Sequence, residues 1–274
     1  MTGNSRTESE RRSRVRPAAV AGTFYPGRRR ELESSIGRML ASAVRQRGRP
    51  KALVVPHAGY IYSGPVAASA YAQLRAPFPP RVVLLGPSHF EPLRGLALPG
   101  AEVFSTPLGD VPVDAAAVDA LVQFSCVVTA AAAHQWEHSM EVQLPFLQRV
   151  LPRFTVVPLA VGQARVDDVA SVLDLLWGGD ETLVVISTDL SHYLPYESAR
   201  TVDAGTARSI LARDPAISDD QACGSHGLRG LLRVAHRRNL SVAQLDLRNS
   251  GDTAGDRSRV VGYGAFAFYE GTTS

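Results

Sequence analysis

The sequence is poor in cysteine and lysine, and it has no long hydrophobic run. Only two of its 274 residues are cysteine, which excludes a fold held by several disulfide bonds. No apolar run approaches the roughly 20 residues that cross a membrane. The early segment RRSRVRPAAV leads into AGTFYPGRRRELE and not into an apolar stretch, which argues against an export signal. We therefore expect a cytoplasmic protein with Cys126 and Cys223 reduced; a disulfide between them is the alternative.

Lysine is nearly absent, because all but one of the 29 basic residues are arginine. The whole chain has a net charge of +3, but residues 1–50 hold twelve arginines against four glutamates, a local net charge of +8. The remaining residues, 51–274, therefore carry a net charge of −5. A basic excess confined to one end does not favour nucleic acid as a partner. We expect residues 1–16 to be a disordered, arginine-rich tail.

Short apolar segments alternate with helical ones along the chain. ALVV, RVVLLG, FTVVPLAVG and ETLVVIS are predicted strands, and the continuously apolar RVVLLG is typical of a strand that is buried on both faces. Stretches such as VDDVASVLDLLWGG place their apolar residues on one helical face. In SGPVAASAYAQL we expect Pro65 in the first helical turn. The alternation predicts an α/β fold: a single three-layer αβα domain over residues 17–274 with a mostly parallel or mixed central sheet.

Three of the seven histidines follow directly on predicted strands. His57 comes after ALVVP, His89 after VVLLGPS, and His192 after LVVISTDLS, which also contains Asp189. Ligands of open α/β sheets bind outside the carboxyl ends of the strands. We therefore expect the three histidines to share one site. For any one histidine alone, packing in the core is the simpler interpretation. Two imidazoles and one anionic ligand can hold a metal ion with positions left open. The anion could be Asp189 or Cys223, or Asp189 could instead orient His192.

Cys223 precedes a predicted helix in QACGSHGLRGLL. The positive end of that helix would favour its thiolate. The alternative is a small buried hydrophobic residue, and Cys126 in VQFSCVVT fits that second interpretation better.

The stretch HQWEHSMEVQLPF matches the inverted zincin pattern H-x-x-E-H. On one helix, His134 and His138 would be zinc ligands and Glu137 the base of a peptidase. Such short motifs often match by chance, and no downstream carboxylate is marked as a further ligand. We therefore interpret Glu137 and His138 as the start of a helix whose N-terminus faces the shared site.

Long segments of the sequence resemble the Memo family, whose prokaryotic members are called AmmeMemoRadiSam system protein B. These segments are RPAAVAGTFYPG, VVPHAGYIYSGPVAASAY, LLGPSHF, WEHSMEVQLPFLQ, ISTDLSHY, CGSHG and VVGYGAFAF. They run in the family's order from about Arg16 to Tyr269. The family is similar in structure to class III extradiol (LigB-like) dioxygenases, so the resemblance implies a LigB-like fold.

The resemblance also implies a set of site residues. His57, His89 and Cys223 would hold the metal, with cysteine where the dioxygenases have a glutamate ligand. The implied ion is Fe(2+), with copper or zinc as alternatives.

Catalytic roles are implied for three further residues. His192, assisted by Asp189, is similar to the catalytic histidine of the dioxygenases. Glu137 and His138 match a family segment that borders the pocket, and His138 is the third expected catalytic residue.

The sequence thus predicts a metal-binding oxidoreductase that depends on non-haem iron or copper and acts on an unknown small molecule or peptide. The alternative is a non-catalytic module that binds a peptide, a phosphopeptide or a metal in the same cleft, as animal family members bind phosphotyrosine peptides. The cysteine favours this alternative, because a thiolate is softer than a carboxylate and is readily oxidised. The family name implies a functional link to an AMMECR1-like protein and a radical SAM enzyme; no membrane partner is expected.

Overall fold

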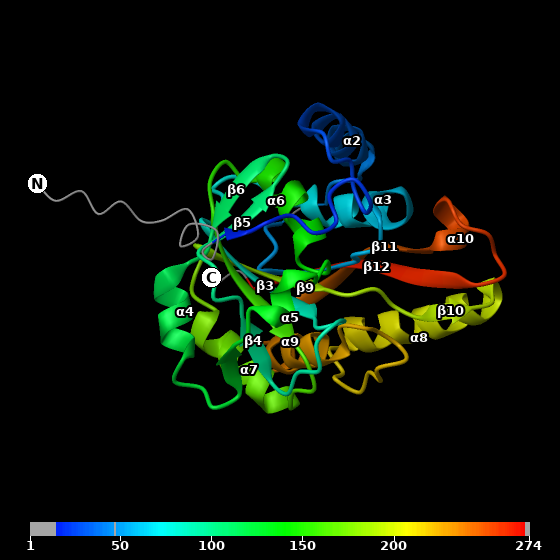
Figure 1. Cartoon of the computed structure of the whole chain (residues 1–274). Coiled ribbons are helices and arrows are strands. Elements are labelled where there is room, and N and C mark those ends of the chain that lie inside the picture. Colours follow the sequence, from blue (N-terminus) through cyan, green and yellow to red (C-terminus); the bar gives the residue numbers. More distant parts are fainter. Residues whose placement is uncertain (1–14, 47, 272–274) are drawn as a thin grey trace, which may run out of the picture.

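The central sheet is mixed, and its middle is parallel (Figure 1). The computed structural model describes residues 15–46 and 48–271. In order across the sheet, the strands are β10 (His192–Leu194), β12 (Val260–Tyr269), β2 (Ala52–Val55), β9 (Thr182–Ser187), β3 (Arg81–Pro87), β8 (Thr155–Val161), β4 (Leu96–Leu98) and β7 (Val127–Thr129), with β11 (Ser241–Asn249) also paired to β12.

Four of the segments predicted as strands form the parallel middle of the sheet. Strands β2, β9, β3 and β8 pair in parallel, whereas β12 and β4 join this group through antiparallel pairs. Every residue of β2 and β9 is buried, as expected for strands covered on both faces. The predicted α/β fold with a mixed sheet is confirmed.

Helices cover both faces of the sheet. Alternate residues of β2 enter different hydrophobic cores: Ala52 and Val54 join one cluster, and Leu53 and Val55 join the other. The first cluster includes residues of α4 (Ala115–Leu121), α7 (Val166–Leu176), α8 (Tyr196–Ala212) and α9 (Ser225–Arg237); the second includes residues of α2 (Arg29–Ser42), α3 (Tyr60–Tyr71) and α6 (Leu144–Val150). In Figure 1, α7, α8 and α9 lie below the sheet, and α2, α3 and α6 lie above it.

Some short elements have no counterpart in the sequence prediction. They are a second sheet of β1 (Val15–Arg16), β5 (Val103–Thr106) and β6 (Gly109–Pro112), together with the strands β4, β7 and β10 and the helices α5 (Ala132–Gln135) and α10 (Ser250–Thr253); a 3-10 helix (Glu141–Gln143) precedes α6. Each has four residues or fewer, which is too short for a hydrophobic period to show.

Two local predictions differ from the structure. The predicted tail lies outside the described residues as far as residue 14, but Val15 and Arg16 form β1, which pairs with β5. Pro65 is the sixth residue of α3 and does not lie in its first turn. No helix within the described ranges is both long and apolar enough to cross a membrane.

Candidate metal site

Three predicted site residues follow neighbouring parallel strands at the same distance. His57, His89 and Asp189 each come two residues after the end of β2, β3 and β9 respectively. Strand β9 lies between the other two. Because the carboxyl ends of parallel strands meet at one edge of the sheet, these side chains converge there.

Cys223 reaches the same edge from the loop that precedes α9. This loop passes so close to the end of β9 that a Cβ on Gly224 would lie 2.7 Å from the carbonyl oxygen of Ser187. The backbone N–H of Asp189 donates to Sγ of Cys223 at 3.3 Å, and the N–H of Cys223 donates to the carbonyl oxygen of Asp189, also at 3.3 Å. The two hydrogen bonds hold the thiol against the strand end.

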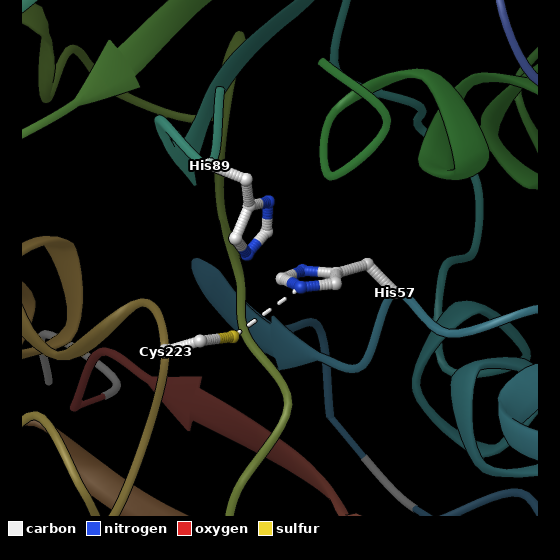
Figure 2. Close-up of side chains that lie close together, drawn as sticks. All are labelled: His57, His89 and Cys223. Atoms are coloured by element: carbon white, nitrogen blue, oxygen red, sulfur yellow. Dashed lines mark hydrogen bonds between the residues drawn. The ribbon is translucent and has the colours of Figure 1, made fainter. Parts of the chain in front are cut away.

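His57, His89 and Cys223 come together as a set of potential ligands (Figure 2). One ligand atom of each lies within 4.8 Å of the other two, and Sγ is 3.3 Å from Nε2 of His57. Two donors at about 2.3 Å from one ion are at most about 4.6 Å apart. A small inward movement therefore brings all three atoms onto one ion; that they bind a metal stays a prediction.

Glu137 orients the imidazole of His89 through hydrogen bonds. Its carboxylate accepts hydrogen bonds from Nδ1 of His89 at 3.0 Å, from the backbone N–H of His89 at 2.7 Å and from that of Ser139 at 2.8 Å. Burial alone would raise the pKa of this carboxyl, but the hydrogen bonds and the charge of His89 lower the pKa of Glu137 to about 2. With Nδ1 bound to the carboxylate, the other ring nitrogen of His89 points toward His57 and Cys223 (Figure 2).

His138 adds a third imidazole to the cluster. Its ring stacks on His89 with centroids 4.8 Å apart, and its centroid is 5.4 Å from that of His57. Burial, with the neighbouring His57, lowers the pKa of His138 to about 4. Burial, with the neighbouring His89, lowers the pKa of His57 to about 3. Both rings are therefore neutral at pH 7, the form that binds metals or accepts protons.

The thiol of Cys223 is neutral in the metal-free protein. Burial raises its pKa to about 12, and the charge of Asp189 adds to this effect. Burial thus outweighs the helix N-terminus, on which the expectation of a thiolate rested. A divalent cation would displace the proton, because the thiolate is the form that ligates metals.

Asp189 and His192 both line the pocket, but no hydrogen bond of the described residues joins them. The Asp189 carboxylate accepts the backbone N–H of His57 at 2.7 Å, and burial raises the pKa of this carboxyl. Nδ1 of His192 is 2.8 Å from the carbonyl oxygen of Leu190, which can only accept. Nδ1 of His192 therefore donates to this oxygen, which leaves Nε2 as the lone-pair nitrogen of the neutral ring form, and Asp189 positions the backbone of His57.

The potential ligands line an open pocket of about 1260 Å³. This volume exceeds the roughly 300–1,000 Å³ of common small-molecule sites. Besides the predicted residues, its lining includes Phe24, Tyr62, Tyr193, Tyr263, Asp219, Asp220, Asp256 and Arg259. The pocket can thus contact both aromatic and charged parts of a ligand.

The H-x-x-E-H segment forms neither the peptidase site that the sequence argues against nor the start of a helix at Glu137 and His138, which lie between α5 and the 3-10 helix. Helix α5 ends at Gln135, so His134 and His138 do not share a helix. Nε2 of His134 is 2.8 Å from the carbonyl oxygen of Ala97, and burial lowers the pKa of His134 to about 4. Within the described part of the chain, the second group of potential ligands is His138 with Glu137 and His89, and it does not include His134.

Arg16 binds the N-terminal segment to the chain around Glu137 through hydrogen bonds and an ion pair. The sequence did not predict this role. Arg16 donates to the carbonyl oxygens of His134 at 3.0 Å and Glu137 at 2.5 Å, and it forms a buried ion pair with Glu141. The Glu141 carboxylate also accepts hydrogen bonds from the backbone of Ala19 and Val20 and from the hydroxyl of Tyr25. The chain after β1 therefore supports the segment that carries Glu137.

Both cysteines are free, so the disulfide alternative is wrong. Cys126 is partly buried and packs against a hydrophobic cluster, in agreement with its interpretation as a small hydrophobic residue.

Residues 16–267 match the sequence model of the Memo-like protein family. The chain belongs to the Memo family. A MEMO1 family protein of Aquifex aeolicus is 33% identical over 268 residues, which cover 91% of this chain and 97% of that protein. A MEMO1 family protein of Methanosarcina acetivorans is 36% identical over 265 residues, covering 92% and 98%. The family predicted from the sequence is thereby confirmed.

The fold also occurs in a solved structure. The crystal structure of an uncharacterized protein from Escherichia coli K12 matches with a TM-score of 0.51 and 14% identity, covering 78% of this chain and 99% of that one. At this identity the match supports the fold alone. The likeness of this Memo family member to LigB-like dioxygenases stays a prediction.

Proposed function

We propose that the chain is a metal-dependent oxidoreductase, with the ion held by His57, His89 and Cys223 at the floor of the pocket. The observation that carries this proposal is the convergence of one ligand atom from each residue within 4.8 Å. Of the possible ions, we propose iron first, with copper or zinc as alternatives.

The donor set fits a divalent cation. Each of the two imidazoles has Nδ1 in a hydrogen bond, His57 with the hydroxyl of Ser187 at 3.0 Å and His89 with Glu137. Such outer partners are typical of metal-bound histidines. One thiolate and two neutral rings would leave one positive charge on a divalent ion, and the remaining coordination positions would face the pocket.

A bound iron ion would supply electron transfer and Lewis-acid activation at this point. The protein would supply proton transfer through His192, whose Nε2 has the free lone pair, with His138 as a second neutral ring in the pocket. Asp189 would hold the His57 backbone in place through the 2.7 Å hydrogen bond.

Elemental analysis of protein purified without oxygen tests the metal proposal. We expect about one equivalent of iron per chain, and its loss in His57→Ala and Cys223→Ala variants that remain folded. Oxygen consumption with a panel of phenols, thiols and peptides then tests the activity. A wild-type protein without metal, even after anaerobic reconstitution, would overturn the proposal.

The alternative function is non-catalytic binding in the same pocket. Two observations favour it: the soft cysteine donor and the pocket volume of about 1260 Å³, which could take a peptide side chain together with its neighbours. We propose a peptide, a phosphopeptide or a delivered metal as the occupant, with a link to an AMMECR1-like protein and a radical SAM enzyme. Stable metal binding without turnover, together with a co-purifying partner, would support this function over the first.

A further inference from the structure

The hydroxyl of Ser187, the last residue of β9, is the centre of a buried hydrogen-bond network behind His57. It lies 3.0 Å from Nδ1 of His57, 2.6 Å from the carbonyl oxygen of Ser139 and 2.8 Å from Nε2 of Gln143. All four residues are buried. Their polar atoms must therefore find partners within the protein, which makes the direction of each hydrogen bond decidable.

The amide of Gln143 is oriented by Pro56. The carbonyl oxygen of Pro56 can only accept, and it lies 2.9 Å from Nε2 of Gln143. The other side of the amide, Oε1, accepts the hydroxyl of Tyr71 at 2.9 Å. The amide nitrogen has two hydrogens, so the second one is donated to Ser187.

These directions decide whether the Ser187 hydroxyl donates to His57 or accepts from it. A serine hydroxyl has one hydrogen and two lone pairs. The hydrogen goes to the carbonyl of Ser139, which can only accept, and one lone pair is taken by Gln143. The second lone pair must accept from His57, so Nδ1 carries the ring hydrogen and Nε2 carries the lone pair that faces Sγ of Cys223, 3.3 Å away.

We propose that Ser187 and Gln143 are positioning residues that fix the tautomer of His57 for metal binding. The inference rests on the proposed metal site and deepens it. His57 also has a hydrogen bond with the backbone of Ser187. Without the hydroxyl this bond is the remaining partner from Ser187, so the ring hydrogen is held on Nδ1 less strongly, and only the tautomer with a bare Nε2 can ligate an ion beside Cys223.

The two imidazoles of the site have different hydrogen-bond partners at Nδ1. Nδ1 of His89 donates to the carboxylate of Glu137, whereas Nδ1 of His57 donates to a neutral hydroxyl. A carboxylate partner makes an imidazole more basic than a hydroxyl does, so His89 would be the stronger nitrogen donor. Ser139 links both arrangements, because its N–H donates to Glu137 and its carbonyl accepts from Ser187.

The nitrogen NMR signals of the His57 ring test the tautomer directly in the metal-free protein. We expect a protonated Nδ1 and an unprotonated Nε2 in the wild type, and a weaker preference in Ser187→Ala, which keeps only the backbone of Ser187 as a partner. A hydrogen on Nε2 of His57 in the wild type would overturn the inference. The measurement needs no metal, so its outcome is separate from that of the proposed function.

The affinity for Zn(II), measured by chelator competition, tests the consequence. Ser187→Ala should weaken binding by about 10- to 100-fold, as loss of an outer partner does, and Ser187→Thr, which keeps a hydroxyl, should restore most of it. Ser69→Ala is the matched control, because Ser69 is a buried serine of α3 outside the network. Equal affinity of Ser187→Ala and wild type would contradict the proposal.

A double-mutant cycle tests whether Gln143 acts through Ser187. Gln143→Met should weaken Zn(II) binding less than Ser187→Ala, and its effect should largely disappear in the Ser187→Ala background. Additive losses would mean that Gln143 affects the site only through general stability, which would overturn its positioning role.

Discussion

The sulfur of Cys223 lies 3.3 Å from Nε2 of His57, although 166 positions separate the two residues in the sequence. The thiol is protonated and the nitrogen carries a lone pair, so the contact is an S–H···N hydrogen bond in the metal-free protein. A metal ion would take the place of this hydrogen. Metal binding is therefore coupled to proton release, and affinity should rise with pH.

Removing the sulfur should abolish tight metal binding. We expect Cys223→Ser to lower the affinity for Zn(II) by more than the roughly 100-fold that loss of an outer partner can cause, because a hydroxyl does not ionise to the ligating form at neutral pH. Chelator competition measures this change. Cys126→Ser is the matched control and should bind like the wild type; a Cys223→Ser variant that also does so would remove the thiol from the ligand set.

Replacing Glu137 by glutamine should weaken the hydrogen bonds that orient the imidazole of His89. Three N–H donors converge on this carboxylate, and the NH₂ of an amide would face one of them. We expect Glu137→Gln to lose about 10- to 100-fold in metal affinity, measured in the same competition assay. Glu33→Gln on the surface of α2 serves as the control, and equal losses in both variants would count against a specific role for Glu137.

Acid should destabilise the metal-free protein partly through His134. Its pKa is lowered by burial from 6.5 to about 4. Between these values the unfolded chain binds a proton that the folded protein does not, so the free energy of unfolding falls as the pH drops, by up to about 1.4 kcal/mol per pH unit. In His134→Leu this contribution is absent.

Urea unfolding of chelator-treated protein between about pH 7 and pH 5 measures the difference. The free energy of unfolding should depend less steeply on pH in His134→Leu than in the wild type. His57 and His138 titrate in both proteins, so the comparison isolates His134. Identical slopes would mean that the pKa of His134 is the same in the folded and unfolded protein, contrary to the prediction.

Breaking the buried ion pair of Arg16 should destabilise the fold and the site together. Arg16→Met leaves the Glu141 carboxylate buried without its cation, for an expected loss of about 3–5 kcal/mol in the free energy of unfolding. Arg200→Met, which removes an exposed partner of Glu197, should cost less than about 1 kcal/mol. Urea unfolding compares the two, and a similar small loss in both would contradict a supporting role for Arg16.

The architecture was predictable where the hydrophobic pattern is strong. Four apolar segments of the sequence form the parallel middle of the sheet, where burial on both faces favours apolar residues throughout a strand. Their order could not be predicted: nothing in ETLVVIS indicates that β9 inserts between β2 and β3. The early start of α3 was also missed, because its first residues look like a turn before Pro65.

The sequence pointed to site residues with distinctive chemistry but not to the residues that support them. His57 and His89 stood out because each follows directly on a strand, whereas the choice of Cys223 over Asp189 as the anionic ligand came from the family resemblance; the structure brings the three side chains together, and their role stays a prediction. Ser187 and Gln143 are ordinary residues in a strand and a helical turn, and their role depends on hydrogen-bond directions that only coordinates supply. The sequence argued against a peptidase site at the H-x-x-E-H motif, but the helix start expected at Glu137 and His138 does not form, because α5 ends at Gln135.

The insertion of β9 between β2 and β3 has a consequence during synthesis. The ribosome completes β2 and β3, and the histidines that follow them, long before it makes β9. Cys223 is made later still. Until β9 is in place, the strands that carry His57 and His89 lack the neighbour that sets their separation. Metal capture would therefore come late in folding, and a nascent chain that ends before Cys223 would present imidazoles without the thiol.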